Sequence, residues 1–249
     1  MVNKEYDSSL QVLTRDIEDD QTGGYGVKFR ELASKAKAFP NHLVLEMLDD
    51  GSTTTCFDGS SFFADSHTIG TGDNLMGGSG TATANGLAYK IVALAKSGMI
   101  KPLIFQDRKP FKLMDDTSSP DAAFRKELRW WIDGEAAAAF GYWWDAVEYT
   151  FTGIPTLTEV QTALGDIEDR FRTFKLPKAF TSDRSEFPHE QLEFSPASMT
   201  FVCATRLGNL MRIALTADTI VNSSSPVTNV YKGFGKLVVS AKINDPTLQ

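Results

Sequence analysis

The stretch YGVKFRELASKAKAFPNHLVLEML, residues 25–48, decides the fold class of this chain. Its apolar side chains recur at intervals of three and four residues, which places them on one face of an α-helix. Because proline fits the first turn of a helix but not its middle, we expect Pro40 to divide the stretch into two helical pieces. A long helix with a single apolar stripe needs a broad surface to lie on, and a sheet is the natural partner. The expected stripe consists of Tyr25, Phe29, Leu32, Ala33 and Ala36, then Leu43, Val44, Met47 and Leu48.

The segments on either side of this helix follow weaker patterns. Residues 2–17 have the texture of a strand because Leu10 and Val12 alternate with polar residues, and a charged bend at residues 15–20 precedes the helix. Six glycines between residues 70 and 86 predict a flexible loop. The other elements expected before residue 152 are a β-rich or looped stretch at 51–63, a short helix at 87–95, and strands at 100–106, 124–132 and 140–151.

A second helix is predicted at residues 156–174. Thr156 and Glu159 have the spacing of a capping box, in which each side chain accepts a hydrogen bond from the other's backbone N–H. The apolar face that follows is Leu157, Val160, Leu164, Ile167, Phe171 and Phe174. Such a face indicates a helix packed on a core.

The remaining segments complete a mixed architecture. A proline-bearing connector at residues 175–196 precedes a strand at 199–203, a helix at 207–215, a loop at 223–226 and a last strand at 236–243. Strands and helices are interspersed without a regular βαβ rhythm. The sequence therefore predicts an α+β fold rather than a Rossmann-type or barrel enzyme.

Composition narrows the class of protein further. The chain has 249 residues, of which 42% are hydrophobic, so it can bury a sizeable core as one large domain or two small lobes. With a net charge of −7, the chain lacks the excess of basic residues that is typical of a nucleic-acid binder. We therefore expect the protein to enclose nucleic acid rather than to bind it tightly. The polar start of the chain is unlike a signal peptide, and no apolar run is long enough to span a membrane, which predicts synthesis in the cytoplasm.

The usual signatures of catalysis and metal binding are missing. Ser79 follows two glycines as in a nucleophile elbow, but Thr81 occupies the position that requires glycine. Asp65 could orient His67 as a base, although a loop histidine beside a carboxylate is more often structural. Cys56 and Cys203 form neither a disulfide framework nor a metal-ligand pattern. The acidic clusters at residues 18–20, 49–50 and 115–116 lack the spacing of a calcium loop. We therefore expect no catalytic residue, no cofactor and no metal.

Aromatic residues offer a different kind of site. Neighbouring residues on a strand point to opposite faces, so one member of each aromatic pair should face the core and the other should face something else. Aromatic side chains are enriched at subunit interfaces. The candidate interface residues are Trp130, Trp131, Tyr142, Trp143 and Trp144.

Five blocks of the chain, taken in order, resemble the Mu-like major head subunit family, often called gpT. The blocks are RDIEDDQTGGYGVKF (15–29), GSTTTCFDGSSFFADSH (51–67), KPLIFQDRKPFKL (101–113), FGYWWDAVEY (140–149) and NVYKGFGKLVVSAKI (229–243). Trp144 falls at the family's tryptophan. The resemblance implies the tailed-phage capsid fold, called HK97-type, with a peripheral lobe that carries a long spine helix on a sheet and an axial lobe at the centre of each capsomer.

The resemblance also assigns parts of the chain to that fold. Residues 1–20 would be the returning strand of an extended loop, and residues 21–55 the peripheral lobe with the spine helix. Residues 56–225 would form mostly the axial lobe with some return to the peripheral lobe, and residues 226–249 a closing strand region. The family's N-terminal arm and outgoing loop strand have no counterpart before Val2. We expect either a truncated product or a naturally shortened shell protein, with an exposed strand edge.

The function implied by the resemblance is that of a major capsid protein. It would self-assemble into hexameric and pentameric capsomers of an icosahedral shell around the double-stranded DNA of a tailed, Mu-like phage or prophage. Its partners would be itself, with scaffold, protease, portal or decoration proteins as further candidates, and no membrane. The shell of a nanocompartment or gene-transfer particle is the alternative within this fold. A small hydrolase using Asp65, His67 and either Ser60 or Ser79 is the alternative from another class.

Overall fold

The computed structural model describes residues 2–20, 23–68, 72–77, 89–96, 100–117, 120–174, 198–222 and 225–243. These residues form two compact units, which we describe separately. The first unit comprises Met1–Val44 and Ile104–Ala139, and the second comprises Leu45–Leu103 and Phe140–Gln249. These boundaries differ from the four segments expected from the resemblance, because residues 104–139 group with the start of the chain. The predicted connector at 175–196 and the predicted glycine loop, apart from residues 72–77, lie outside the described residues.

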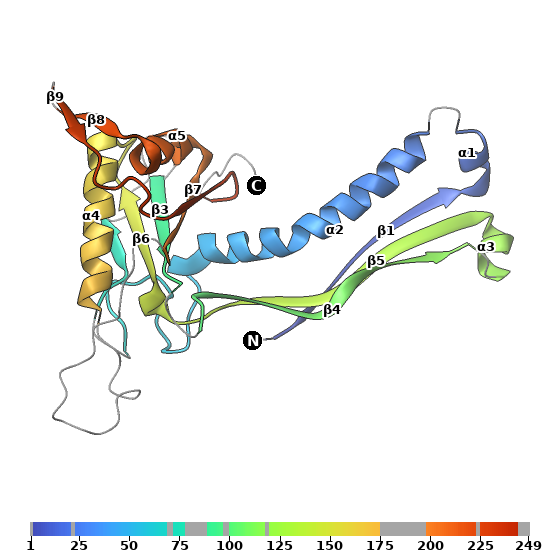
Figure 1. The fold of residues 1–249 in the computed structure, drawn as a ribbon. Helices are drawn as coiled ribbons and strands as arrows, with labels where there is room; N and C mark the ends of the chain where they lie inside the picture. The colour runs from blue at the N-terminus through green and yellow to red at the C-terminus, as the bar shows by residue number, and fades with distance from the viewer. Residues whose placement is uncertain are drawn as a thin grey trace. The chain divides into compact units, whose positions relative to one another are not determined.

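The first unit is a helix on a three-stranded sheet (Figure 1). The sheet has the order β1 (Lys4–Leu13), β5 (Glu127–Phe140), β4 (Leu103–Asp116), and β1 runs antiparallel to β5 along its whole length. The helix is α2 (Gly24–Asp49), and the short helices α1 (Thr14–Glu18) and α3 (Pro120–Arg125) adjoin the strands. The predicted helix on a sheet is therefore confirmed, but α1 replaces the expected charged bend, and the strands predicted at 100–106 and 124–132 are longer and shifted.

Helix α2 is continuous, so the predicted break at Pro40 is wrong. Proline removes one backbone N–H, and the helix nevertheless runs through it from Gly24 to Asp49. Asp20 caps the start of the helix, because its carboxylate accepts hydrogen bonds from the backbone N–H groups of Gly24 (3.1 Å) and Tyr25 (3.0 Å). Phe39 packs on Tyr6 of β1 at 4.5 Å between ring centroids, which fixes the helix on its sheet.

The second unit is built on a five-stranded sheet. Its strand order is β10 (Lys236–Ser240), β7 (Thr200–Ala204), β3 (Tyr89–Leu94), β6 (Ala146–Phe151), β2 (Leu75–Gly77). Every residue of the central strand β3 is buried, so the short helix predicted at 87–95 is wrong. A short apolar run is equally compatible with a buried strand, and periodicity cannot separate the two.

Two helices pack against this sheet (Figure 1). Helix α4 (Leu157–Thr173) contacts β6, and α5 (Thr205–Thr216) contacts β7, β10 and α4. Both confirm the sequence prediction, and the Thr156–Glu159 capping box is formed. The hairpin of β8 (Thr219–Asn222) and β9 (Ser225–Thr228) and the 3-10 turns η1 (Asp50–Ser52) and η2 (Trp143–Asp145) complete the unit. All members of the large buried core cluster belong to the second unit.

Buried charges join β3, β6 and the end of α2, which belongs to the second unit from Leu45 onward. Lys90 of β3 pairs with Asp49 at the end of α2 (3.0 Å) and with Glu148 of β6 (3.2 Å). Burial alone would lower the pKa of Lys90, but the two carboxylates outweigh it and raise that pKa. Among the described residues, no helix is both long enough and apolar enough to cross a membrane.

Candidate functional site

The structure separates Trp130 from Trp131 as strand alternation predicts. Trp130 meets Phe29 of α2 with ring centroids 4.5 Å apart, so it lies on the helix-covered face of the sheet. Trp131 is paired with Ser9 of β1, and the two lie on the opposite face. On that face all the β1 residues are exposed, whereas Trp131 is half-buried.

The other aromatic pair is placed differently from the prediction. Trp143 and Trp144 lie in the 3-10 turn η2 rather than on a strand, so alternation does not apply to them. Both are buried within the chain, at 0% and 3% exposure. Tyr142 is half-buried and stacks on Trp144 at 4.3 Å between centroids. Trp143 and Trp144 are therefore core residues of the single chain. Of the five candidates, only Trp130, Trp131 and Tyr142 have exposed surface that a neighbouring subunit could contact.

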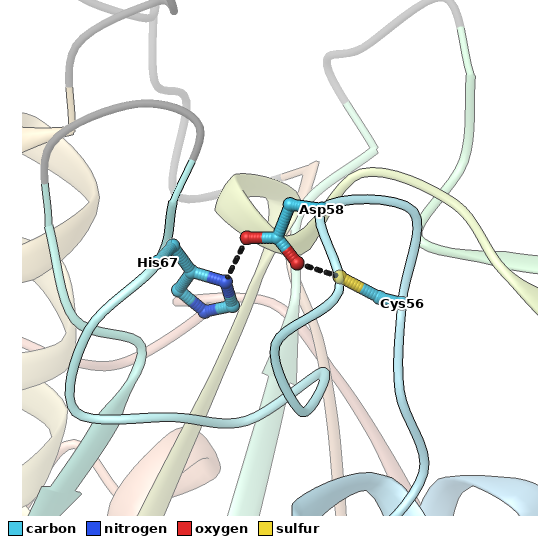
Figure 2. A group of neighbouring side chains, drawn as sticks. All are labelled: Cys56, Asp58 and His67. Carbon is cyan, nitrogen blue, oxygen red and sulfur yellow. Dashed lines mark hydrogen bonds and ion pairs between the residues drawn. The ribbon is translucent and has the colours of Figure 1, made fainter.

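A polar cluster that the sequence did not reveal lies in the loop between η1 and β2 (Figure 2). His67 Nδ1 lies 2.8 Å from Asp58 Oδ2, and the thiol of Cys56 donates to Asp58 Oδ1 at 2.9 Å. The side chains of His67 and Asp58 have no exposed surface. The acid that holds His67 is therefore Asp58, whereas the expected partner Asp65 is exposed.

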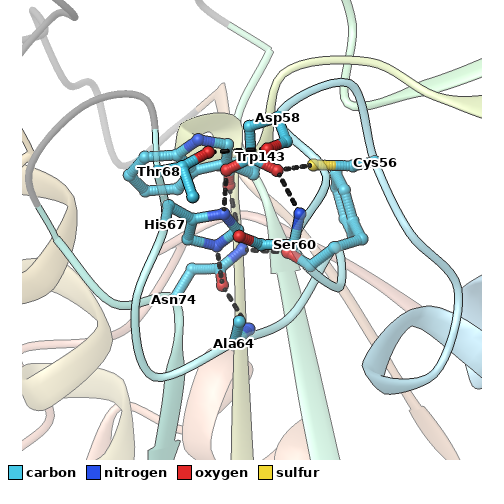
Figure 3. Close-up of polar contacts among 9 residues, drawn as sticks. Cys56, Asp58, Ser60, Ala64, His67, Thr68, Asn74 and Trp143 are labelled. Carbon is cyan, nitrogen blue, oxygen red and sulfur yellow. Dashed lines mark hydrogen bonds and ion pairs between the residues drawn. The ribbon is translucent and has the colours of Figure 1, made fainter.

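Neighbouring groups fix the orientation of this cluster (Figure 3). His67 Nε2 faces Asn74 Oδ1 at 3.0 Å, and the ring stacks flat on Trp143 with centroids 4.0 Å apart. Asn74 donates to the carbonyl oxygens of Phe62 (2.7 Å) and Trp143 (3.1 Å), while its Oδ1 accepts from the backbone N–H of Ala64 (3.0 Å). Because the Asn74 amide nitrogen donates to two carbonyl oxygens, the amide oxygen is the atom that faces His67 Nε2.

The environment of the cluster shifts the pKa values of two of its side chains, Cys56 and Asp58. Burial, together with the hydrogen bond to Asp58, raises the pKa of the Cys56 thiol to about 11. Burial alone would raise the pKa of Asp58, but hydrogen bonds from Cys56, His67 and the backbone N–H of Ser60 outweigh it and lower that pKa. Cys56 is consequently a neutral thiol near pH 7, which makes it a poor nucleophile.

The other candidate residues have structural surroundings or lie outside the described chain. Asp49 belongs to the Lys90 ion pair, and Asp20 caps α2. Asp115 accepts a hydrogen bond from the hydroxyl of Thr117. Ser60 contributes its backbone N–H to Asp58, and Ser79 lies outside the described residues. The described residues contain no nucleophile–base–acid arrangement for the hydrolase alternative.

Solved structures with the same fold define the class of this protein. The chain superposes on the bacteriophage JBD30 capsid with a TM-score of 0.74 and 19% identity, covering 98% of this chain and 76% of that one. The JBD30 procapsid gives a TM-score of 0.68 at 21% identity, covering 96% and 75%. The fold is that of a phage capsid subunit, HK97-like, as predicted.

Sequence relatives specify the family. The family described as "Mu-like prophage major head subunit gpT" matches residues 1–168. The major capsid protein of Escherichia phage Mu is 26% identical over 96% of this chain and 75% of its own length. The Mu-like prophage FluMu major head subunit of Haemophilus influenzae is 28% identical over 57% of this chain and 49% of its own length. The chain belongs to the Mu-like gpT major head subunit family, and it is a structural capsid protein rather than an enzyme.

Proposed function

We propose that copies of this chain associate into five- and six-membered rings and that these rings close into an icosahedral shell around double-stranded phage DNA. Head-to-tail contacts between identical subunits generate rings whenever the rotation closes, which suits a single protein that must enclose a volume. Its net charge of −7 suits a container, because a strongly basic wall would hold the packaged polyanion by counterion release. The assembled protein would reside in the virion capsid after synthesis in the host cytoplasm.

The observation that carries this proposal is the thin core of the first unit. Its buried hydrophobic residues, among those described, are Val12, Ala122, Ile132, Ala136 and Ala137, and three of the five are alanines. On the face of the sheet away from α2, the described β1 residues are exposed, and Phe124 of α3 is 88% exposed. A unit with so little buried apolar surface gains stability when neighbouring subunits cover it.

We place one subunit contact on the uncovered face of the sheet, around Trp131. A large aromatic ring in an exposed, polar face is typical of an interface anchor, which buries its apolar area only on association. Tyr142 is a second candidate in the other unit. We further propose that the first unit corresponds to the peripheral lobe and the second to the axial lobe. The JBD30 capsid described as decorated with minor capsid protein trimers makes a decoration protein a reasonable additional partner.

Substitution of the two adjacent tryptophans tests the proposal. Trp131→Ala should leave the melting temperature of the unassembled subunit nearly unchanged and reduce the assembled fraction in sedimentation velocity. Trp130→Ala is the matched control, because loss of its contact with Phe29 should lower the melting temperature. If Trp131→Ala assembles as completely as the unmodified protein, the contact does not involve this face.

A further inference from the structure

The loop cluster brings together three different metal-binding atoms. The thiol sulfur of Cys56, a carboxylate oxygen of Asp58 and a ring nitrogen of His67 all lie within 4.8 Å of one another (Figure 2). In a tetrahedral zinc site, bonds of about 2.0–2.3 Å place neighbouring donor atoms roughly 3.3–3.8 Å apart. The hydrogen bonds of 2.8 and 2.9 Å to Asp58 are somewhat shorter than that, so His67 and Cys56 each need to move from Asp58 by less than about 1 Å to admit an ion.

Asn74 and Trp143, which are not donors themselves, hold His67 in the orientation that a metal ligand needs. A histidine that binds a metal through one ring nitrogen usually donates its other N–H to a carbonyl or carboxylate oxygen. His67 does this with Asn74 Oδ1 (3.0 Å), and the Asn74 amide is itself held by three backbone groups (Figure 3). The flat stack on Trp143 prevents the ring from turning away. Nδ1 of His67 is thereby held toward Asp58.

The cluster also lies in a segment with little regular structure. Between η1 and β2, the described backbone forms only an isolated bridge between Thr55 and Ser61 and a few turn hydrogen bonds. An ion bound to Cys56, Asp58 and His67 would link the two ends of this loop. Because the unfolded chain has no preformed site, the binding free energy of the ion stabilises the folded loop.

We propose that Cys56, Asp58 and His67 bind a single thiophilic divalent ion, with Zn²⁺ as the ion that fits best. Sulfur and imidazole donors favour zinc over calcium or magnesium, which prefer oxygen ligands. On binding, the Cys56 thiol releases the proton that now points toward Asp58, His67 binds through Nδ1 as a neutral ring with its Nε2–H on Asn74, and the carboxylate exchanges its contacts with the two side chains for a bond to the ion. Three protein donors leave the fourth position of the ion to a water molecule.

Metal titration of the full chain tests this proposal. Protein dialysed against a chelator and then against buffer is titrated with ZnCl2 by calorimetry and, separately, with Co²⁺ by absorption spectroscopy. We expect one ion per chain, a thiolate-to-cobalt charge-transfer band, and a higher melting temperature with zinc. Cys56→Ala should weaken zinc binding by at least tenfold and abolish the band.

The second cysteine provides the matched control. Cys203 is buried in β7 and is not among the three donor residues, so Cys203→Ala should keep both the band and the zinc affinity. Absence of the cobalt band from the unmodified protein, or equal zinc binding by Cys56→Ala, would show that the cluster is only a hydrogen-bond network. Should Cys56→Ala fail to fold, the cobalt band of the unmodified protein decides the question. Neither result depends on assembly, so the shell function can stand if the metal site fails.

Discussion

At the scale of single residues, burial changes the acidity of Asp145. It is 1% exposed in the turn η2, and among the described residues its Oδ2 atom has no hydrogen-bond partner. Burial raises the pKa of Asp145 to about 6, with Lys101 acting weakly in the opposite direction. The acid is therefore neutral in the fold at a pH where the unfolded chain, with a pKa of about 3.9, is already ionised.

This difference predicts how stability depends on pH. A carboxyl whose pKa is raised in the folded state stabilises the fold below its unfolded pKa, and that contribution is lost as the pH rises through about 6. From pH 4.5 to pH 7.5, Asp145→Asn should gain on the order of 2 kcal/mol of unfolding free energy relative to the unmodified protein. Urea unfolding at the two pH values measures this gain. Asp65→Asn controls for the removal of a charge at an exposed site. If the difference in unfolding free energy between Asp145→Asn and the unmodified protein is the same at both pH values, the Asp145 carboxyl is not buried.

A second residue-scale prediction concerns the core under α4. Leu164 is fully buried on the face of α4 that packs into the core of the second unit, so Leu164→Ala leaves a cavity there. The change should lower the free energy of unfolding by about 2–5 kcal/mol, measured by chemical denaturation. Thr162→Ala, at an exposed position of the same helix, should have little effect. Equal effects of the two substitutions would contradict the orientation of the helix.

At the scale of elements, α2 carries a proline in its interior. Pro40 leaves the carbonyl of Ala36 without its helical N–H donor, and alanine would restore that bond. Alanine is favoured over proline inside a helix by about 3 kcal/mol, and the greater freedom of the unfolded chain offsets up to about 1 kcal/mol of this. Pro40→Ala should therefore raise the free energy of unfolding by about 2–3 kcal/mol. Ser34→Ala, at an exposed site of α2, is the control that measures the helix propensity of alanine alone. If Pro40→Ala is instead less stable than the unmodified protein, the proline is required for packing.

The elements predicted correctly from the sequence are those whose signals are local. The Thr156–Glu159 capping box and the apolar face behind it define α4 without reference to the rest of the chain. Strand β3 pairs with β6 and β7 along its two edges and is buried on both faces, so its apolar run has no strand period, and the helix prediction failed there. Strand β4 continues past its apolar start into a mostly charged and exposed stretch, and β5 continues through an Asp-Gly-Glu-alanine stretch, and neither continuation has the apolar alternation of a strand.

The sites were predicted less well than the fold, for a related reason. The two-residue alternation applied to Trp130 and Trp131, which lie on a strand, but not to Trp143 and Trp144, which lie in a 3-10 turn. The link between Asp58 and His67 crosses an irregular loop, where no period relates sequence distance to spatial distance. The order of the blocks that resemble the family, rather than any single residue, indicated the function.

At the scale of the whole molecule, the two units differ in how much apolar surface each buries within a single chain. The second unit has a large buried core formed by β3, β6, β7 and the helices α4 and α5. The first unit buries few apolar side chains and has an uncovered sheet face, with β1 and β4 as its edge strands. This division fits a capsid subunit in which one unit is stable alone and the other is completed by its neighbours.

Negative-stain electron microscopy of the purified chain, together with its mass from light scattering, tests self-assembly most directly. We expect closed shells, or rings of five and six subunits, with a mass that is a multiple of 27.4 kDa. A uniform 27.4 kDa monomer at every protein concentration and salt condition would contradict it.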